Sequence, residues 1–215
     1  MEVKLSTIVP GILEEVLVDR GDFVKKDQVL FRLRSDVERA NYEVVKAKAA
    51  FAARRVVRNE ELYRRKMISI HEKDEMETER DLLNLEVREA EERLKLRSIQ
   101  SPLDGVVVRR FNSPGERVED QPILELAQID PLRVELVVPV GLHGKVQVGM
   151  TASVEWEVPV GGAHRAKVTV VDPVVDAASG TIGIRLELPN PKGLLPAGTK
   201  CWVTLPVGSG APRTR

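Results

Sequence analysis

Cysteine, aromatic residues and an excess of charge of either sign are all scarce or missing in this sequence. The single cysteine, Cys201, cannot form an internal disulfide, and its place in an alternating apolar run favours a buried, unreactive thiol. Aromatic residues make up 4% of the chain, too few for a base-stacking platform or an aromatic sugar site. Lysine plus arginine number 33 and aspartate plus glutamate number 33, so no net charge draws the chain to nucleic acid or an anionic membrane.

Long hydrophobic runs are missing too. No apolar run approaches the roughly 20 residues that cross a bilayer as a helix. Residues 1–5 lack the apolar stretch of a secretory signal. If the protein works in the periplasm, we therefore expect its signal or anchor to have been removed before this numbering begins.

The sequence motifs of catalysis and metal binding do not occur. His71, His143 and His164 lie far apart in the sequence, and spacings such as HExxH and CxxC are absent. The chain has no glycine-rich phosphate loop and no serine in a nucleophile elbow. We therefore expect a protein that is not an enzyme and that holds no metal and no cofactor.

What the chain does contain is an internal repeat whose two copies lie 94 positions apart. A glycine, a glycine–acid pair, a valine and an aliphatic pair occur as Gly11, Gly21-Asp22, Val24 and Val29-Leu30, and again as Gly105, Gly115-Glu116, Val118 and Ile123-Leu124. Each copy alternates like a strand, and the glycine–acid pairs are turn signals. Since each copy is too small to bury a core alone, we expect the two to close on each other.

This repeat resembles the two halves of a biotinyl/lipoyl domain, which is a flattened β-sandwich. In a carrier domain of that kind, a short hairpin between the halves presents a lysine for biotin or lipoate. About 60 residues of another character occupy the junction here. A biotinyl or lipoyl carrier subunit is therefore a lesser alternative for the function.

The junction, residues 35–96, predicts a helical hairpin because it lacks glycine and proline and is rich in charge. Apolar residues at three- and four-residue steps predict the seam between two helices, namely Val37, Ala40, Val44, Ala47 and Phe51, and then Met76, Leu83, Val87, Ala90 and Leu94, with Arg80 in the gap. Ser69 and Glu72 have the spacing of a capping box, which begins a second helix. We predict two antiparallel helices, residues 36–67 and 70–96, in a coiled coil.

The end of this hairpin carries the pattern Arg-x3-Leu-x6-Ser as Arg58, Leu62 and Ser69. A split lipoyl domain with an inserted hairpin and this tip strongly resembles the membrane fusion proteins (HlyD-like superfamily), which are periplasmic adaptors of RND and ABC efflux pumps. The resemblance implies that the tip docks on a TolC-like outer-membrane channel. Arg58 would supply charge and hydrogen bonds, Leu62 an apolar contact and Ser69 a hydroxyl. Many members have glycine three residues before the serine, where this chain has Lys66.

Five alternating runs in the last third of the chain each predict a strand, at residues 132–138, 152–156, 166–171, 181–188 and 199–205. Their regular spacing favours a small closed β-barrel. The short segments at residues 172–176, 179–181, 188–191 and 195–198 predict turns, and they also resemble turn segments in the barrel of RND-type adaptors.

The predicted fold class is α+β, mainly β with an α-helical hairpin. A split lipoyl-like β-sandwich occupies residues 1–34 and 97–130, the coiled-coil hairpin residues 35–96, a β-barrel residues 131–207 and a flexible tail residues 208–215. The strands of the family's membrane-proximal domain are missing at both ends, so we expect either a minimal adaptor or a shortened chain.

The resemblance implies a periplasmic adaptor, associated with the inner membrane, in a tripartite efflux pump. Its partners would be an inner-membrane RND transporter, a TolC-like outer-membrane channel and further copies of itself in a ring, and the exported compounds small molecules. Adaptors of ABC-type efflux or of type I secretion remain alternatives, although type I adaptors usually have a far longer hairpin.

Overall fold

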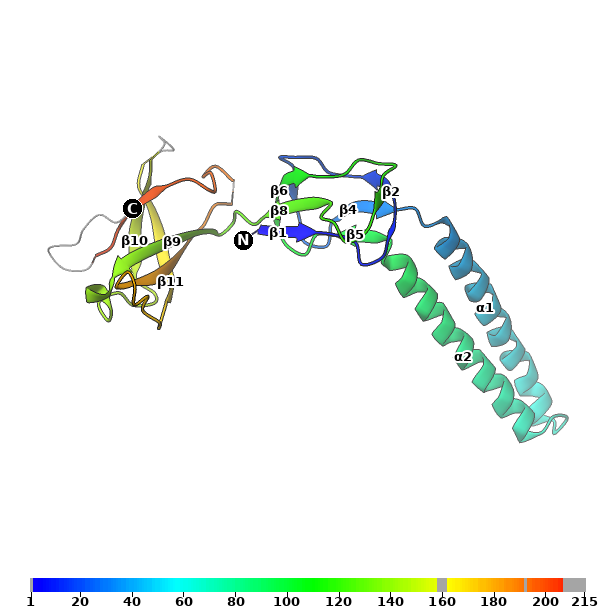
Figure 1. The fold of residues 1–215 in the computed structure, drawn as a ribbon. Coiled ribbons are helices and arrows are strands. Elements are labelled where there is room, and N and C mark those ends of the chain that lie inside the picture. The colour runs from blue at the N-terminus through cyan, green and yellow to red at the C-terminus, as the bar shows by residue number, and fades with distance from the viewer. Residues whose placement is uncertain (1, 158–161, 192, 207–215) are drawn as a thin grey trace. The chain divides into compact units, whose positions relative to one another are not determined.

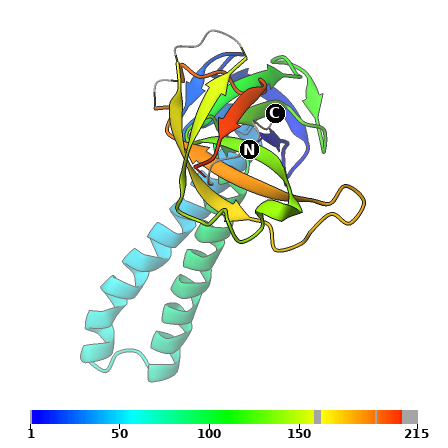
Figure 2. The ribbon, with the colours of Figure 1, turned by 90° about the vertical axis from the view of Figure 1, so that its left-hand side faces the viewer.

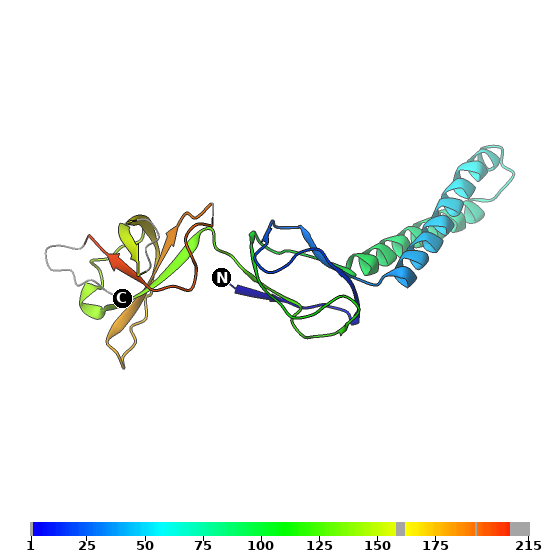
Figure 3. The same cartoon turned by 90° about the horizontal axis from the view of Figure 1, so that it is seen from above.

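The computed structural model describes residues 2–157, 162–191 and 193–206. They form two compact units, one comprising residues 4–102 and 107–125 and the other formed mainly by residues from 126 onward. In Figures 1 and 3 the first unit is a β-sandwich that carries two long helices, and the second is a curved sheet. The fold is mainly β with two helices, as the sequence predicts.

Thirteen strands, two α-helices and one short 3₁₀ helix are present in the described residues. The strands of the sandwich are β1 (Glu2–Leu5), β2 (Gly11–Val16), β3 (Phe23–Val24), β4 (Val29–Leu33), β5 (Ser98–Gln100), β6 (Gly105–Arg110), β7 (Arg117–Val118) and β8 (Leu124–Ala127). The helices between β4 and β5 are α1 (Asp36–Arg64) and α2 (Ile70–Lys95). The elements that follow are β9 (Leu132–Pro139), η1 (Val140–Leu142), β10 (Thr151–Trp156), β11 (His164–Val171), β12 (Thr181–Leu188) and β13 (Cys201–Thr204).

The sandwich consists of two four-stranded sheets that repeat the same order. One sheet has the order β1-β8-β6-β3 and the other β5-β4-β2-β7. A shift of 94 residues carries β2 onto β6, β3 onto β7 and β4 closely onto β8, so each strand falls at the matching place of the other sheet. The internal repeat of the sequence is therefore a repeat of structure.

Hydrogen bonds between the two halves also obey the repeat. The Leu13 N–H donates to the Glu116 carbonyl at 2.8 Å, and the Val107 N–H donates to the Asp22 carbonyl at 2.9 Å. The two bonds are equivalent under the repeat, because Val107 lies 94 residues after Leu13 and Glu116 lies 94 residues after Asp22. The prediction that the two halves close on each other is confirmed.

The glycine–acid pairs form turns that also make hydrogen bonds between the two halves. Gly21 has φ +95° and Gly115 has φ +92°, a conformation that side chains with a Cβ rarely adopt. The Gly21 N–H donates to the Val107 carbonyl at 2.8 Å, and the Gly115 N–H donates to the Leu13 carbonyl at 2.7 Å. Each turn thus reaches the central strand of the other half.

The helices α1 and α2 lie side by side and are joined by residues 65–69 (Figures 1 and 2). The chain reverses direction between them, so they form a hairpin, as the sequence predicts. Helix α2 begins where expected, at Ile70, whereas α1 ends at Arg64 and not at residue 67.

The side of α1 that packs on α2 is not the one the sequence predicts. Val45, Ala49 and Ala52 are the buried residues of α1, whereas Val44 and Phe51 of the predicted seam are each 54% exposed. On α2 the predicted seam is correct, because its members are half-buried or buried. Helix α1 carries two apolar stripes, and the alanine-rich one lets the helix axes approach more closely.

The second unit is a five-stranded antiparallel sheet in the order β13-β10-β11-β12-β9, which curls into a nearly closed barrel (Figure 2). Strands β9 and β12 pair over eight positions, and alternate residues of β9 are buried. Each of the five predicted strands overlaps an observed one. The inward side chains form one apolar core, which includes Val138, Val154, Val168, Ile184 and Leu186.

Asn190, which the sequence suggests only as a turn residue, is buried in this unit and fully hydrogen-bonded. Its side-chain amide donates to the carbonyls of Ile129 and Leu195, each at 3.1 Å, and its side-chain oxygen accepts from the Leu195 N–H at 3.1 Å. Its own N–H donates to the Asp130 carboxylate at 2.8 Å. Asn190 therefore fastens the segment before β9 to the loop before β13.

Candidate functional site

The end of the hairpin, residues 57–73, contains the three residues that the sequence singles out. Helix α1 ends in a Schellman motif: the Lys66 N–H donates to the Tyr63 carbonyl at 2.8 Å, and the Met67 N–H donates to the Leu62 carbonyl at 2.9 Å. Lys66 itself has φ +57°, the left-handed conformation that usually requires glycine at this position. The Schellman turn at the end of α1 therefore forms although the position holds lysine in place of glycine.

Ser69 begins α2 through the predicted capping box, which is confirmed. The Glu72 N–H donates to Ser69 Oγ at 3.2 Å, while the Ser69 N–H and Oγ–H donate to Glu72 Oε2 at 2.7 and 2.9 Å. The hydrogen bond from the Ser69 backbone and then that from its hydroxyl lower the pKa of Glu72. The exposed Ser69 hydroxyl keeps one lone pair for a partner outside the chain.

Arg58 and Leu62 lie one turn apart on the last part of α1, four residues from each other, and so share a side of the helix. Arg58 is exposed and pairs with no acid among the residues that the structure describes. By contrast, the neighbouring Arg65 pairs with Glu61 at 2.8 Å. Leu62 is half-buried, so it is not the freely exposed anchor that the sequence suggests.

Exposed apolar surface around the turn comes from two further residues, which sequence reasoning did not select. Met67 is 68% exposed in the connecting loop, and Ile70 is 56% exposed in the first turn of α2. The signal was present, because Met67-Ile68-Ser69-Ile70 is an apolar run at a turn, where polar residues are usual. We call Arg58, Met67, Ile70 and the cap at Ser69, all near this end of the hairpin, the hairpin tip.

Contacts between the helices hold the tip in place. Lys73 Nζ lies 3.3 Å from Glu60 Oε2 and 4.7 Å from the centre of the Tyr63 ring. The hydrogen bond with Glu60 raises the pKa of Lys73, so its ammonium stays charged. One turn further on, the Asn59 side-chain amide lies 2.9 Å from Met76 Sδ. The tip is thus presented on a braced pair of helices.

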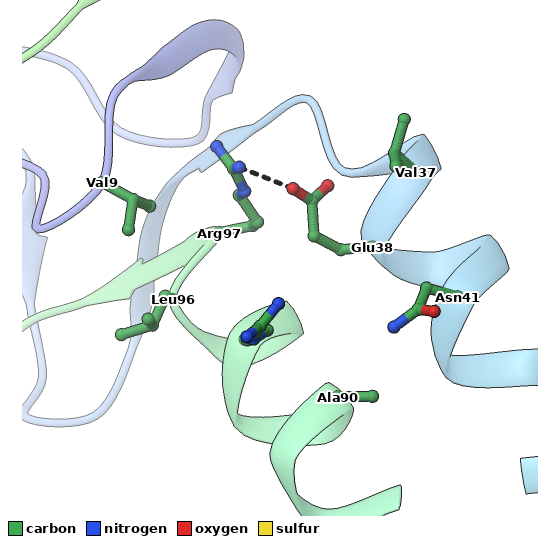
Figure 4. Close-up of a pocket in the computed structure, with 8 residues that line it drawn as sticks. Val9, Val37, Glu38, Asn41, Ala90, Leu96 and Arg97 are labelled. Carbon is green, nitrogen blue, oxygen red and sulfur yellow. Dashed lines mark hydrogen bonds and ion pairs between the residues drawn. The ribbon is translucent and has the colours of Figure 1, made fainter. Parts of the chain in front are cut away.

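The other end of the hairpin joins the sandwich around a cavity of about 460 Å³ (Figure 4). Its lining residues are Val9, Val37, Glu38, Asn41, Ala90, Arg93, Leu96 and Arg97. Arg97 donates to Glu38 on α1 at 2.5 Å and to the Pro10 carbonyl at 2.9 Å. The guanidinium therefore links both helices to the sandwich, which is a structural role.

Within residues 2–157, 162–191 and 193–206, no group of three or more His, Cys, Asp or Glu side chains is arranged to hold a metal ion. In the same described part of the chain, no helix combines the length and apolarity needed to cross a membrane.

Comparison with known families identifies both β-rich parts. Residues 2–128 match the CzcB-like, barrel-sandwich hybrid domain, and residues 132–208 match the CusB-like, beta-barrel domain. The first match alone covers more than half of the chain, with the hairpin inside it.

Individual proteins are similar to this chain over most of its length. An uncharacterized protein of Haemophilus influenzae is 24% identical over 182 residues, which cover 84% of this chain and 48% of that protein. The chain thus spans about half the length of this curated relative. A MacA–MexA chimeric protein that contains the Pseudomonas aeruginosa MexA α-hairpin domain superposes with a TM-score of 0.82 at 20% identity, over 100% of this chain and 80% of that one.

A membrane fusion protein from Streptococcus pneumoniae R6 gives a TM-score of 0.73 at 16% identity, covering 97% of this chain and 99% of that one. At these identities the likeness shows a shared fold, and the domain matches supply the family. The chain belongs to the membrane fusion proteins, the family of periplasmic efflux-pump adaptors.

Proposed function

We propose that this chain is the periplasmic adaptor of a tripartite efflux pump that joins an inner-membrane RND transporter to a TolC-like outer-membrane channel. The observation that carries the proposal is the hairpin tip. It combines Arg58, which pairs with no acid in the described part of the chain, with the exposed side chains of Met67 and Ile70, beside a loop fixed by caps from both helices. An apolar centre flanked by an arginine is typical of a protein-docking surface.

Each residue of the hairpin tip would make a different contact with the channel. The planar Arg58 guanidinium would donate to carboxylate or carbonyl oxygens of the channel. Met67 and Ile70 would bury apolar surface, and Ser69 would accept a hydrogen bond through its free lone pair. Leu62 would act mainly by position, because its carbonyl holds the Met67 N–H.

The remaining parts would serve assembly. Sandwiches of several copies would form a ring, and the CusB-like barrel would contact the transporter in the periplasm at the inner membrane. Each contact can be weak, because several copies that engage at once raise the effective concentration of the next contact. In this role the chain is a connector for small-molecule export and performs no chemistry of its own.

The experiment that tests docking is site-specific photocrosslinking in the native cell. A photoreactive residue at Met67 is expected to capture the outer-membrane channel, and Arg58→Asp is expected to abolish that capture. Arg88→Asp is the matched control, because Arg88 is an exposed arginine in the middle of α2. Capture of nothing at the outer membrane, or equal loss in both variants, would contradict the proposal.

A further inference from the structure

The cavity at the hairpin base lies where the close contact between the two helices ends. The buried residues of α1 are Val45, Ala49 and Ala52, and no residue from 36 to 44 is buried. On α2 the buried residue is Ala90, and an alanine fills little of the space beside it. The start of α1, the end of α2 and the loop before β2 therefore enclose about 460 Å³ that the chain's own side chains leave open.

Two sides of this cavity differ in polarity (Figure 4). Val9, in the loop before β2, and Leu96, which follows α2, lie together on one side. Glu38 and Asn41 of α1 lie across from them. A molecule that fits here therefore needs an apolar part and a polar part.

Two polar side chains at the cavity have hydrogen-bonding capacity to spare. Asn41 makes no side-chain hydrogen bond with the part of the chain that the structure describes, and its amide projects from α1 toward α2 (Figure 4). Arg93 of α2 pairs with Glu89 at 2.6 Å, but these side chains are 67% and 62% exposed, so water weakens the pair. A guanidinium has five N–H donors, and most of those of Arg93 remain available.

The charges around the cavity favour an anion. Two arginines and one glutamate line it, a net charge of +1. Arg97 donates to Glu38, and these two side chains are only 20% and 22% exposed, so the pair is held in place and its charges cancel. Arg93 carries the remaining charge, and arginine binds carboxylates through parallel donors.

We propose that this cavity binds a small amphipathic carboxylate. The carboxylate accepts hydrogen bonds from Arg93 and from the Asn41 amide, and the apolar body lies against Val9 and Leu96. The volume falls within the range of about 300–1,000 Å³ that is typical of small-molecule sites. The bound molecule contacts α1, α2 and the loop before β2 at once, so it also ties the base of the hairpin together.

This inference goes beyond the proposed function. The cavity lies at the end of the hairpin opposite the tip, and binding there does not depend on docking of the tip.

Calorimetric titration with decanoate tests the site, and decylammonium is the probe of opposite charge. Both are used below their micelle-forming concentrations, so that single molecules bind. Decanoate is expected to bind about tenfold more tightly than decylammonium, because only the carboxylate pairs with Arg93. Arg93→Gln is expected to weaken decanoate binding about tenfold. Arg88→Gln is the matched control and should leave binding unchanged, because Arg88 is an exposed arginine of α2 outside the cavity.

Filling the cavity provides a second variant. Asn41→Trp places a large side chain in the space, at a position that is exposed and does not pack in the hairpin seam. Decanoate binding is expected to be lost, while the circular dichroism of the helices is kept.

The place of binding is checked by NMR with a decanoate that carries a nitroxide at the end of its chain. The amide signals of Val9 and Leu96 are expected to broaden, and that of Met67, at the other end of the hairpin, to stay sharp. Any of four results would overturn the proposal: no binding of decanoate, equal affinity for both probes, equal weakening by Arg93→Gln and Arg88→Gln, or broadening only away from the cavity.

Discussion

The barrel and the helical hairpin, two regions of one chain, treat their apolar residues in opposite ways. In β12 the side chains of Ile182, Ile184 and Leu186 are almost completely buried. In α1 the large side chains of Val44 and Phe51 face water while alanines form the contact. A nearly closed sheet encloses its own core, whereas two helices share one line of contact and leave the rest of each helix open. The helix surfaces outside that line of contact are therefore exposed and available to bind other molecules.

The largest expected effect comes from truncating one large apolar side chain to alanine in each region. Leu186→Ala should lower the free energy of unfolding of the barrel by about 2–4 kcal/mol, because it leaves a cavity in a packed core. Phe51→Ala should change stability by less than about 0.5 kcal/mol in dilute solution, although it removes more atoms.

Chemical denaturation can follow the two regions separately. Both tryptophans, Trp156 and Trp202, lie in barrel strands, so their fluorescence reports the barrel. Far-ultraviolet circular dichroism reports the helices. If Phe51→Ala proved as damaging as Leu186→Ala in dilute solution, the stripe on α1 would have to be covered within one chain, and the contrast between the regions would fail.

The second prediction concerns the buried polar anchor of the barrel. Asn190→Ala should destabilise this unit by about 2–3 kcal/mol, because it leaves the Ile129 and Leu195 carbonyls without their buried donor. Asn84→Ala, on the exposed side of α2, is the control and should be nearly neutral. Equal effects in tryptophan-monitored denaturation would contradict the role given to Asn190.

Much of the architecture was predictable because it depends on local patterns. The repeat, the five barrel strands and the Ser69 cap follow from turn signals, alternation and capping, each of which operates over a few residues. The role of Asn190 was not predictable, since its partners at residues 129 and 130 lie about 60 positions away and sequence spacing does not reveal them.

The hairpin shows where periodicity stops being informative. Helix α1 has two apolar stripes, and the sequence favours the one with larger side chains, including Phe51. The structure uses the one with Ala49 and Ala52, because the choice depends on how closely α2 can approach. The tip motif lies at the end of the hairpin where the chain turns, yet which apolar side chains are exposed there depends on the turn, in which Met67 is 68% exposed.

A smaller effect is expected at the cap of α2. Ser69→Ala should weaken the start of this helix by about 1 kcal/mol, seen as faster amide exchange in its first turn. The capping box also makes this turn sensitive to pH. Because the pKa of Glu72 is lowered in the fold, the unfolded chain binds the proton more readily, so the stabilisation is present above the ordinary value of 4.5 and is lost as pH falls through the lower, folded value.

Exchange measured between pH 6 and pH 3 tests the sign of that effect. In the parent chain, protection of the first turn of α2 should decrease in this range beyond the intrinsic pH dependence of exchange. In Ser69→Ala the decrease should be smaller but still present, because the hydroxyl's bond to the Glu72 carboxylate is gone while the larger contribution, from the Ser69 N–H, remains. A matching pH response in parent and variant would show that the hydroxyl does not act through Glu72.

The smallest predicted effect is a gain in stability at the turn itself. Lys66 has φ +57°, which costs a residue with a Cβ about 1–2 kcal/mol, and glycine avoids that cost while losing about 0.5–1 kcal/mol through the entropy of the unfolded chain. Lys66→Gly should therefore stabilise the turn by about 0.5 kcal/mol, which slows exchange of the Met67 amide about twofold. Lys66→Ala, which keeps the Cβ, should give no such slowing. If alanine slowed exchange as much as glycine, the lysine charge beside Arg64 and Arg65, and not the backbone conformation, would be what limits the stability of the tip.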